Sequence, residues 1–361
     1  MFQNTTISRR QALDLLLKSA AATGAIVVGG LLIADWRKNQ RGSTLFAGDL
    51  LNPKHPLPEH LLTPIDEFYV QSYALLPPTL KATDWQLQID GAVTNPLTIS
   101  WDEVLAAPQQ DIYLTMECIG NQTGGNLIGN ALWTGTPLLP WLQRAGVLPE
   151  ATEWVMHGAD SYETTLPIAE LMRPDVRLVH RMNGEPLTRD HGYPMRIIIP
   201  GHYGQKQPKW IVRLEAIAKP KRGYWERQGW SNTAIIPTHS LVRQLQADRV
   251  WNRHHRVSFT KDGELGWGSG VLIAGVALDG TAPISRVMVS TDDGSTWQSA
   301  EQSHPDSPHE WTLWRYFWQP TQPGNYTVLA RAETSNTQQS LEDDNPKDGS
   351  SGALRIFVTL S

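Results

Sequence analysis

We predict that the chain folds as an α+β domain followed by an all-β sandwich of the immunoglobulin-like type. Up to residue 240, strand and helix patterns alternate irregularly, which favours α+β over a doubly wound sheet. After residue 240, strand patterns are separated by turn signals and no helical period is found. The 15 Trp and 25 Pro among 361 residues fit strands, turns and aromatic packing better than a helical bundle.

Local patterns predict the elements of the α+β domain. Alternating apolar residues over 85–89 indicate a strand. Ser100 and Glu103 form the capping box that begins a short helix. Residues 137–146 start with proline and end with glycine, as many helices do. Further strands are expected at Tyr113–Glu117, Trp154–His157 and Arg196–Ile199.

The sandwich is predicted from strand runs and the turns between them. Ile284–Ser290 alternates and leads into the hairpin turn signal of residues 292–294, Asp-Asp-Gly. A polar loop is expected over 336–351. The remaining strands are expected at Trp311–Trp318, Tyr326–Glu333 and Leu354–Leu360.

The first 45 residues are predicted to be a targeting segment, ahead of domains at 46–240 and 241–361. Arg9-Arg10 precedes a short uncharged run, 19–34, in the order of an export signal. The arginine pair resembles the twin-arginine signal of proteins that are exported folded, so we expect a periplasmic or other extracytoplasmic location. Two alternatives stay open: residues 19–34 are an uncleaved membrane anchor, or the pair stands by chance before a buried helix.

Composition excludes some functions and singles out Cys118. The net charge of −5 gives no reason to expect a nucleic-acid partner. Cys118 is the only cysteine, stands at the end of a predicted strand and is followed by the glycine-rich residues 119–125. Such a loop brings backbone amides close to a ligand, and a thiolate is a soft metal ligand. A buried structural thiol and a cysteine-nucleophile hydrolase are the alternatives.

Three separated segments resemble the sulfite oxidase family of molybdopterin-dependent oxidoreductases. Residues 114–141, LTMECIGNQTGGNLIGNALWTGTPLLPW, resemble the segment with the molybdenum-binding cysteine. Residues 182–211, MNGEPLTRDHGYPMRIIIPGHYGQKQPKWI, resemble the pterin-binding segment. STDDGSTWQ (290–298) and WTLWRYFW (311–318) resemble the C-terminal immunoglobulin-like dimerisation domain. The resemblance covers residues 60–361 and implies a sulfite-oxidase-type molybdopterin-binding domain before the sandwich.

The resemblance implies a role for each matching position. Cys118 matches the thiolate ligand of molybdenum, in one molybdenum–molybdopterin cofactor per chain. Arginine and lysine donors suit the phosphate that the pterin carries. Without the resemblance, residues 190–192 would be taken for a surface turn. Cofactor-binding roles are implied for Tyr73, Asp160, His191, Arg196, Gln207 and Lys209.

The chain departs from the family where sulfite would bind. Family members that oxidise sulfite have an arginine at the position of Gln71 and two more at the positions of Gln122 and Thr123. Their active-site tyrosine aligns with Trp230. Sulfite is an anion and needs a cationic pocket. Gln71 and Trp230 are therefore predicted to border a less cationic substrate pocket, which suits a neutral substrate such as a sulfoxide.

These observations predict an exported molybdenum-cofactor oxidoreductase that transfers oxygen atoms, with two electrons, to or from a small molecule. The chain has no Cys-x-x-Cys-His haem motif, so electrons must pass through a separate carrier, for example a cytochrome. The resemblance also implies a homodimer formed through residues beyond 245. The alternatives are a non-catalytic exported binding protein on the same fold and a sulfite oxidase with a rearranged pocket.

Overall fold

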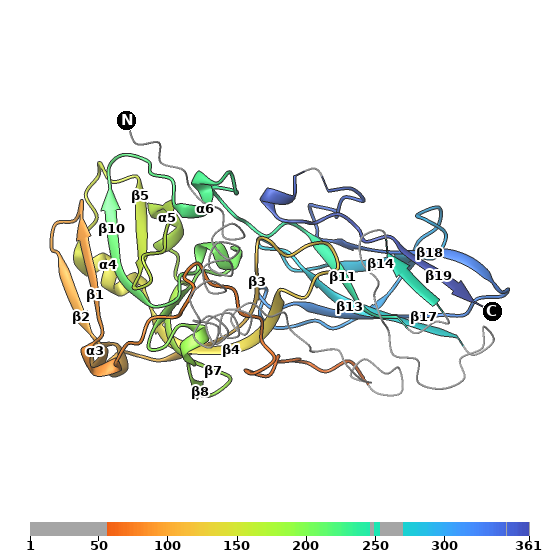
Figure 1. Cartoon of the computed structure of the whole chain (residues 1–361), viewed down its shortest axis with the longest axis horizontal. Helices are drawn as coiled ribbons and strands as arrows, with labels where there is room; N and C mark the ends of the chain where they lie inside the picture. Colours follow the sequence, from red (N-terminus) through yellow and green to blue (C-terminus); the bar gives the residue numbers. More distant parts are fainter. Residues whose placement is uncertain (1–55, 246–248, 253–269, 344, 361) are drawn as a thin grey trace, which may run out of the picture.

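The computed structural model describes residues 56–245, 249–252, 270–343 and 345–360. Figure 1 shows them as an elongated molecule, with a mixed part at one end and an all-β part at the other. The predicted targeting segment, 1–45, and its uncharged run, 19–34, lie outside the described residues. Within those residues no helix is both long enough and apolar enough to span a membrane.

Two sheets and several short helices build the mixed part. One sheet has the order β2-β1-β10-β5-β6, in which β1 and β10 run parallel and the other neighbours antiparallel. The other has the order β3-β4-β7-β8, with β9 also paired to β7. The strands are β1 (Gln86–Gly91), β2 (Leu97–Ser100), β3 (Gln110–Glu117), β4 (Ile128–Pro137), β5 (Glu153–Gly158), β6 (Glu163–Pro167), β7 (Arg177–Met182), β8 (Glu185–Pro186), β9 (Arg196–Ile198) and β10 (Ile211–Ile217). The helices are α3 (Trp101–Ala106), α4 (Leu139–Ala145), α5 (Ile168–Leu171) and α6 (Tyr224–Arg227), with 3₁₀ turns η1 (Ala82–Asp84), η2 (Arg189–His191) and η3 (Gly204–Lys206).

Local sequence signals located most of these elements. The predicted capping box of α3 is confirmed: Glu103 N donates to Ser100 Oγ, and Ser100 N donates to Glu103 Oε2 at 2.8 Å. The helix predicted from residue 137 begins instead at Leu139, because Pro137 is still paired with β7 as the last residue of β4. Gly146 ends it in the left-handed conformation, with φ of 68°.

The all-β part is a sandwich of two sheets. Their orders are β11-β13-β17-β16 and β12-β19-β18-β14-β15. Apolar side chains of both sheets, among them Ile273, Trp314, Val328 and Ile356, form one core between them. The two-sheet sandwich is confirmed, and its narrower immunoglobulin-like assignment stays a prediction. The elements are β11 (His239–Leu245), β12 (Arg249–Asn252), β13 (Val271–Leu278), β14 (Arg286–Ser290), β15 (Gln298–Ser299), β16 (Glu301–Gln302), β17 (Thr312–Trp318), β18 (Gly324–Glu333), β19 (Ile356–Leu360) and the 3₁₀ turn η5 (Pro346–Asp348).

The two parts meet in a packed junction beside β3 and β11 (Figure 1). A separate apolar cluster joins Leu61 and Ile128 of the mixed part to Leu241, Trp311 and other residues of the sandwich. Backbone contacts reinforce it, since Thr115 N in β3 donates to the carbonyl of residue 309 at 2.9 Å. The strand that leads to Cys118 is therefore held by both parts.

A buried ion pair between η3 and α6 holds α6 against the rest of the mixed part. Lys206 Nζ contacts the carboxylate of Glu226, and both side chains are 0% exposed. The ammonium also donates to Thr165 O at 2.9 Å and lies 3.2 Å from Thr164 Oγ1. Because every partner is internal, removing one member leaves an uncompensated buried charge.

Lys206→Met should therefore lower the free energy of unfolding by about 3–5 kcal/mol, measured by urea denaturation. The double variant Lys206→Met/Glu226→Gln should recover much of this loss, because it removes both charges. Lys221→Met is the matched control: it breaks a surface pair with Glu163, and we expect less than about 1 kcal/mol. Equal losses in both single variants would contradict this interpretation.

Candidate functional site

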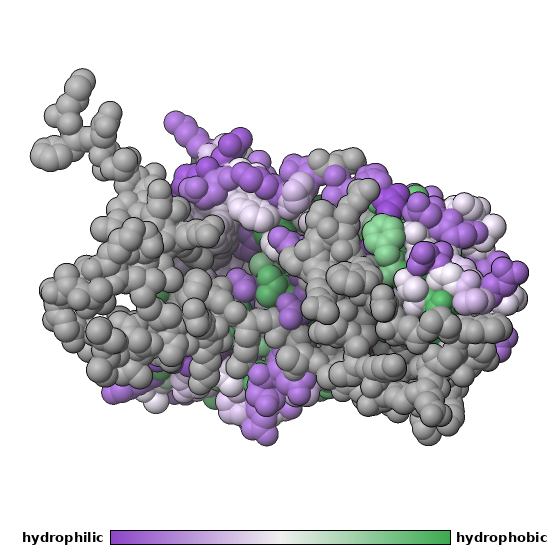
Figure 2. All heavy atoms as spheres, turned by 45° about the vertical axis from the view of Figure 1, so that its right-hand side comes forward, coloured by the Kyte–Doolittle hydropathy of each residue, from purple (hydrophilic) through white to green (hydrophobic). Residues whose placement is uncertain are grey.

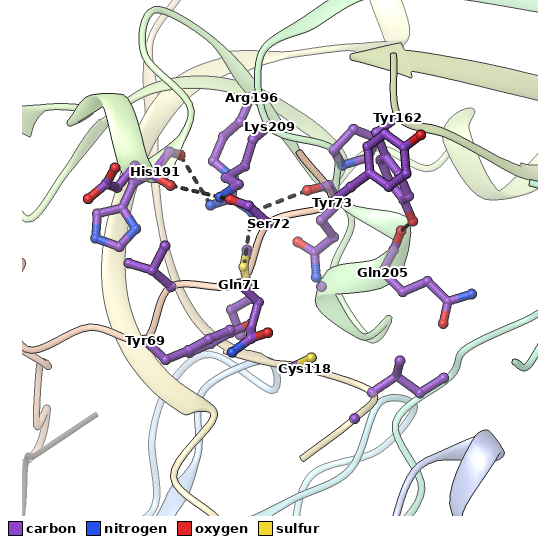
Figure 3. Close-up of a pocket in the computed structure, with 18 of the residues that line it drawn as sticks. Tyr69, Gln71, Ser72, Tyr73, Cys118, Tyr162, His191, Arg196, Gln205 and Lys209 are labelled. Atoms are coloured by element: carbon purple, nitrogen blue, oxygen red, sulfur yellow. Dashed lines mark hydrogen bonds between the residues drawn. The ribbon is translucent and has the colours of Figure 1, made fainter. Parts of the chain in front are cut away.

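All the residues that the sequence analysis proposed for the site line one cavity in the mixed part (Figure 3). The cavity encloses about 1040 Å³ of empty space, part of it open to solvent. Its walls come from the segment before β1, the end of β3, the β5–β6 turn, η2 to β10, and α6 with the loop after it. The predicted residues among its lining are Gln71, Tyr73, Cys118, Asp160, His191, Arg196, Gln207, Lys209 and Trp230.

Cys118 stands directly after β3, with its sulfur directed into the cavity (Figure 3). Its backbone N–H donates to Leu127 O at 2.9 Å, which closes the loop that follows. Burial raises the pKa of the thiol to about 11, a backbone hydrogen bond from Gly120 opposes this shift, and the charge of Glu117 adds to it. The thiolate is the form that binds a metal, so binding of a metal cation must displace this proton.

Arg196, the first residue of β9, is a buried cation at the other side of the cavity (Figure 3). Its guanidinium donates to the carbonyls of His191 and Gln207, both at 3.2 Å, and lies over the ring of Trp133. Its Nε is buried and has no hydrogen-bond partner among the described residues. Burial lowers the pKa of Arg196 to about 10.

Lys209 lies next to Arg196 in the cavity wall (Figure 3). Its ammonium donates to Ser72 Oγ at 2.6 Å and to Asp190 O at 2.8 Å. Burial and then the Arg196 charge lower the pKa of Lys209 to about 7, although Asp160 opposes them. A buried guanidinium beside a half-buried ammonium forms a site that favours a bound anion.

Three predicted residues surround these cations. Asp160 turns the β5–β6 connection, and its carboxylate accepts from Tyr162 N at 3.1 Å. Burial raises the pKa of Asp160, while this hydrogen bond and Lys209 lower it. His191 is buried, with Nε2 at 3.2 Å from Ile65 O. The Gln207 amide is bound on both sides by the protein backbone, so it stiffens the wall of the cavity.

An aromatic wall rises beside Cys118. Tyr73 packs against Tyr224 and Tyr162, with ring centroids 4.5 Å and 5.9 Å apart. Trp225 continues the wall from Tyr224 to Trp230. A Cβ atom at Gly120 would lie 3.6 Å from the Trp230 ring and 3.8 Å from the Cys118 sulfur, so both side chains lie against the backbone of Gly120.

The sequence analysis did not single out several residues that shape the cavity. Ser72 accepts from Lys209, and the Tyr162 hydroxyl donates to Gln205 O at 2.7 Å. Met116 contributes its sulfur at 3.1 Å from an Arg196 nitrogen. Ser72 and Tyr162 lie within two residues of predicted site positions, and that proximity was the only signal available for them.

The three positions that the resemblance matched to arginines, Gln71, Gln122 and Thr123, supply no cation here. Gln71 lines the cavity, whereas Gln122 is exposed and outside its lining. Thr123 donates instead to Asp343 Oδ2 at 2.8 Å. Within the described part of the chain, Arg196 and Lys209 are the only arginine or lysine side chains that line the cavity.

Comparisons with known proteins agree with this arrangement. Residues 74–225 match the model of the oxidoreductase molybdopterin binding domain family. The chain is 28% identical to mitochondrial sulfite oxidase of Drosophila melanogaster, with 72% of this chain and 51% of that protein covered. It is 30% identical to the Homo sapiens enzyme, with 73% and 54% covered, so it spans about half the length of these relatives. The crystal structure of the sulfane dehydrogenase SoxCD from Paracoccus pantotrophus has the same fold, with a TM-score of 0.68, 22% identity and 83% of each chain covered.

The depressed pKa of Lys209 predicts a pH-dependent stability of the cofactor-free chain. Between about pH 7 and pH 10 the unfolded chain holds this proton and the native chain does not, so this residue's contribution to stability rises with pH. Lys209→Met should therefore exceed the parent in unfolding free energy most clearly near pH 7, with the difference shrinking toward pH 10. Urea denaturation across this range tests it, and a constant difference would contradict the lowered pKa.

Proposed function

We propose that this chain, which belongs to the sulfite oxidase family of molybdopterin-dependent oxidoreductases, transfers oxygen atoms to or from a small neutral substrate such as a sulfoxide. It is an enzyme whose cofactor is molybdenum–molybdopterin. The observation that carries the proposed substrate class is the lining of the cavity near Cys118, where Gln71 and Trp230 stand at positions that the resemblance matched to an arginine and a tyrosine. Among the described residues, Arg196 and Lys209 are the only arginine and lysine that line the cavity.

The residues of the cavity fit this cofactor. Cys118 presents a soft sulfur ligand. Arg196, which is buried, and Lys209, which is half-buried, have no carboxylate within hydrogen-bond distance among the described residues. The orphaned Nε of Arg196 is a donor available to an anionic group. Cys118 would hold the metal, and Arg196, Lys209, Asp160 and the His191 segment would hold the pterin and its phosphate.

The cofactor, when bound, supplies the two-electron redox chemistry of oxygen-atom transfer. The protein itself would bind and orient the cofactor and shield the substrate pocket from water. A bound phosphate would favour the charged form of Lys209 and so fix the anionic end of the cofactor. The aromatic wall limits the water beside Cys118, and the Trp230 indole N–H can donate to a polar substrate oxygen.

The substrate class follows from charge. An anion beside Cys118 would lose hydration, and it would meet the amide of Gln71 where a guanidinium would be needed. A sulfoxide carries no net charge, has one strong acceptor oxygen, and its alkyl groups can contact aromatic rings. The same wall therefore favours the neutral ligand and disfavours sulfite.

The setting of the enzyme is also part of the proposal. The arginine pair before residues 19–34 supports export to the periplasm, with cleavage or retention of this segment left to experiment. Electrons pass to or from a separate carrier such as a cytochrome, because the chain has no Cys-x-x-Cys-His motif. Two chains are proposed to associate through residues beyond 245, and light scattering tests this.

Metal content tests the cofactor site. The parent from a molybdenum-competent host should contain about one molybdenum per chain, and Cys118→Ser should lose most of it, because a hydroxyl is a much poorer soft-metal ligand. Plasma mass spectrometry with a pterin assay measures both. Asn126→Ser, at an exposed position of the same loop, is the matched control and should load normally. A folded parent without molybdenum would favour the non-catalytic binding protein.

Substrate turnover tests the charge argument. Gln71→Arg should raise kcat/KM for sulfite by roughly tenfold or more and lower it for a dialkyl sulfoxide, because it places a cation in the substrate wall. Gln122→Arg adds the same charge outside the cavity and should change neither. Parent turnover of sulfite at the level of a sulfite oxidase would identify a rearranged sulfite pocket and overturn the neutral-substrate proposal.

A further inference from the structure

The loop that carries Cys118 is held from outside its own domain. Residues 118–127 leave β3 and return to β4, and the loop packs against the sandwich (Figure 1). A Cβ atom at Gly124 would lie 2.6 Å from Leu354 Cδ2, so the loop backbone touches the sandwich directly. The hydrogen bond from Thr123 to Asp343 adds a polar contact at the same place.

Two residues of β11 reach the loop at both of its ends. His239 Nε2 lies 3.0 Å from Glu117 Oε2, and both side chains are almost fully buried. The contact is a close ion pair without hydrogen-bond geometry. The guanidinium of Arg243 donates to the carbonyl of Gly125. His239 and Arg243 flank Leu241, which packs in the junction between the two parts of the molecule. A single strand, β11, therefore supplies all three contacts, with Arg243 at the position where its pairing with β13 shifts register.

These contacts continue inside the loop toward Cys118. Glu117 Oε1 accepts from Asn121 Nδ2 at 2.8 Å, and Asn121 Oδ1 accepts from Leu127 N at 2.9 Å. Asn121 N donates to Cys118 O at 2.8 Å. A Cβ atom at Gly125 would lie 2.4 Å from Asn121 Oδ1 and 2.8 Å from the backbone carbonyl oxygen of Gln122, so this tight return favours glycine. A displacement of Glu117 or Gly125 must therefore move the backbone of Cys118.

We propose that His239 and Arg243 are positioning residues of the molybdenum site: they fix the Cys118 loop from the sandwich domain through Glu117 and Gly125. Neither residue lines the cavity, and neither belongs to the matched family segment 74–225. The inference rests on the proposed ligand role of Cys118. It makes the sandwich a working part of the site, because it fixes the direction of the metal-binding sulfur.

Alkylation of the cofactor-free full-length chain tests the proposal, because Cys118 is the only thiol. Cys118 is half-buried and faces the cavity. Its thiol therefore reacts at a basal rate through the cavity and at an additional rate whenever the loop opens, so Arg243→Met and His239→Leu should accelerate iodoacetamide labelling several-fold at fixed pH, by about threefold or more. Loss of a nearby cation by itself raises a thiol pKa and slows labelling, so acceleration reports opening of the loop. His239→Gln keeps a donor toward Glu117 and should stay within about twofold of the parent.

Arg315→Met is the matched control: Arg315 is a buried arginine of β17 in the same sheet as β11, paired with Glu301 away from the loop. It should leave labelling unchanged even where its melting temperature falls as much as that of Arg243→Met. In the loaded enzyme, Arg243→Met should also shift the Mo(V) electron paramagnetic resonance spectrum, and Arg315→Met should not.

Two results would overturn the proposal. One is that Arg243→Met is labelled at the same rate as the parent. This result is sufficient by itself if His239→Leu does not fold. The other is equal acceleration in Arg315→Met, which would show general destabilisation. Labelling needs neither cofactor nor substrate, so its outcome is independent of the sulfoxide and sulfite assays.

Discussion

The site depends on where β3 ends. This strand pairs with β4 in the mixed part and bonds through Thr115 to the sandwich, so its last residue, Glu117, is fixed by two bodies at once. Cys118 follows with its sulfur toward the cavity and its loop toward β11. A ligand on a freely moving loop would lose orientation, whereas a ligand at a strand end retains it. The other cavity walls are arranged around this fixed point.

The cavity separates two electrostatic environments. Near the η2–β9 segment, Arg196 and Lys209 lie close together with depressed pKa values, an arrangement that is unfavourable until an anion binds. Near Cys118, aromatic rings and neutral amides replace charge. A ligand with an anionic end and a metal end matches both environments in one orientation only. The separation therefore orients the cofactor before any contact with the substrate.

Sequence patterns predicted the local structure well because its causes are local. Apolar alternation located β1, and the capping box located the start of α3. The predicted start of α4 was wrong. Pro137 ends a strand instead of beginning a helix because it pairs with β7, a partner that the local sequence does not reveal. The assembled site was predicted only through the resemblance of separated motifs. Ser72 was missed, because its role arises from Lys209, which is 137 positions away along the chain.

The high pKa of the Cys118 thiol also affects the chain before it acquires its cofactor. At neutral pH the sulfur stays protonated, and oxidants and disulfide partners react with thiolates far faster than with thiols. A newly folded chain should therefore form sulfenic acid, or crosslink to a second copy, more slowly than a chain with an ordinary exposed thiol. The raised pKa of this half-buried sulfur thus preserves the ligand, and coordination by the metal provides the charge that deprotonates it.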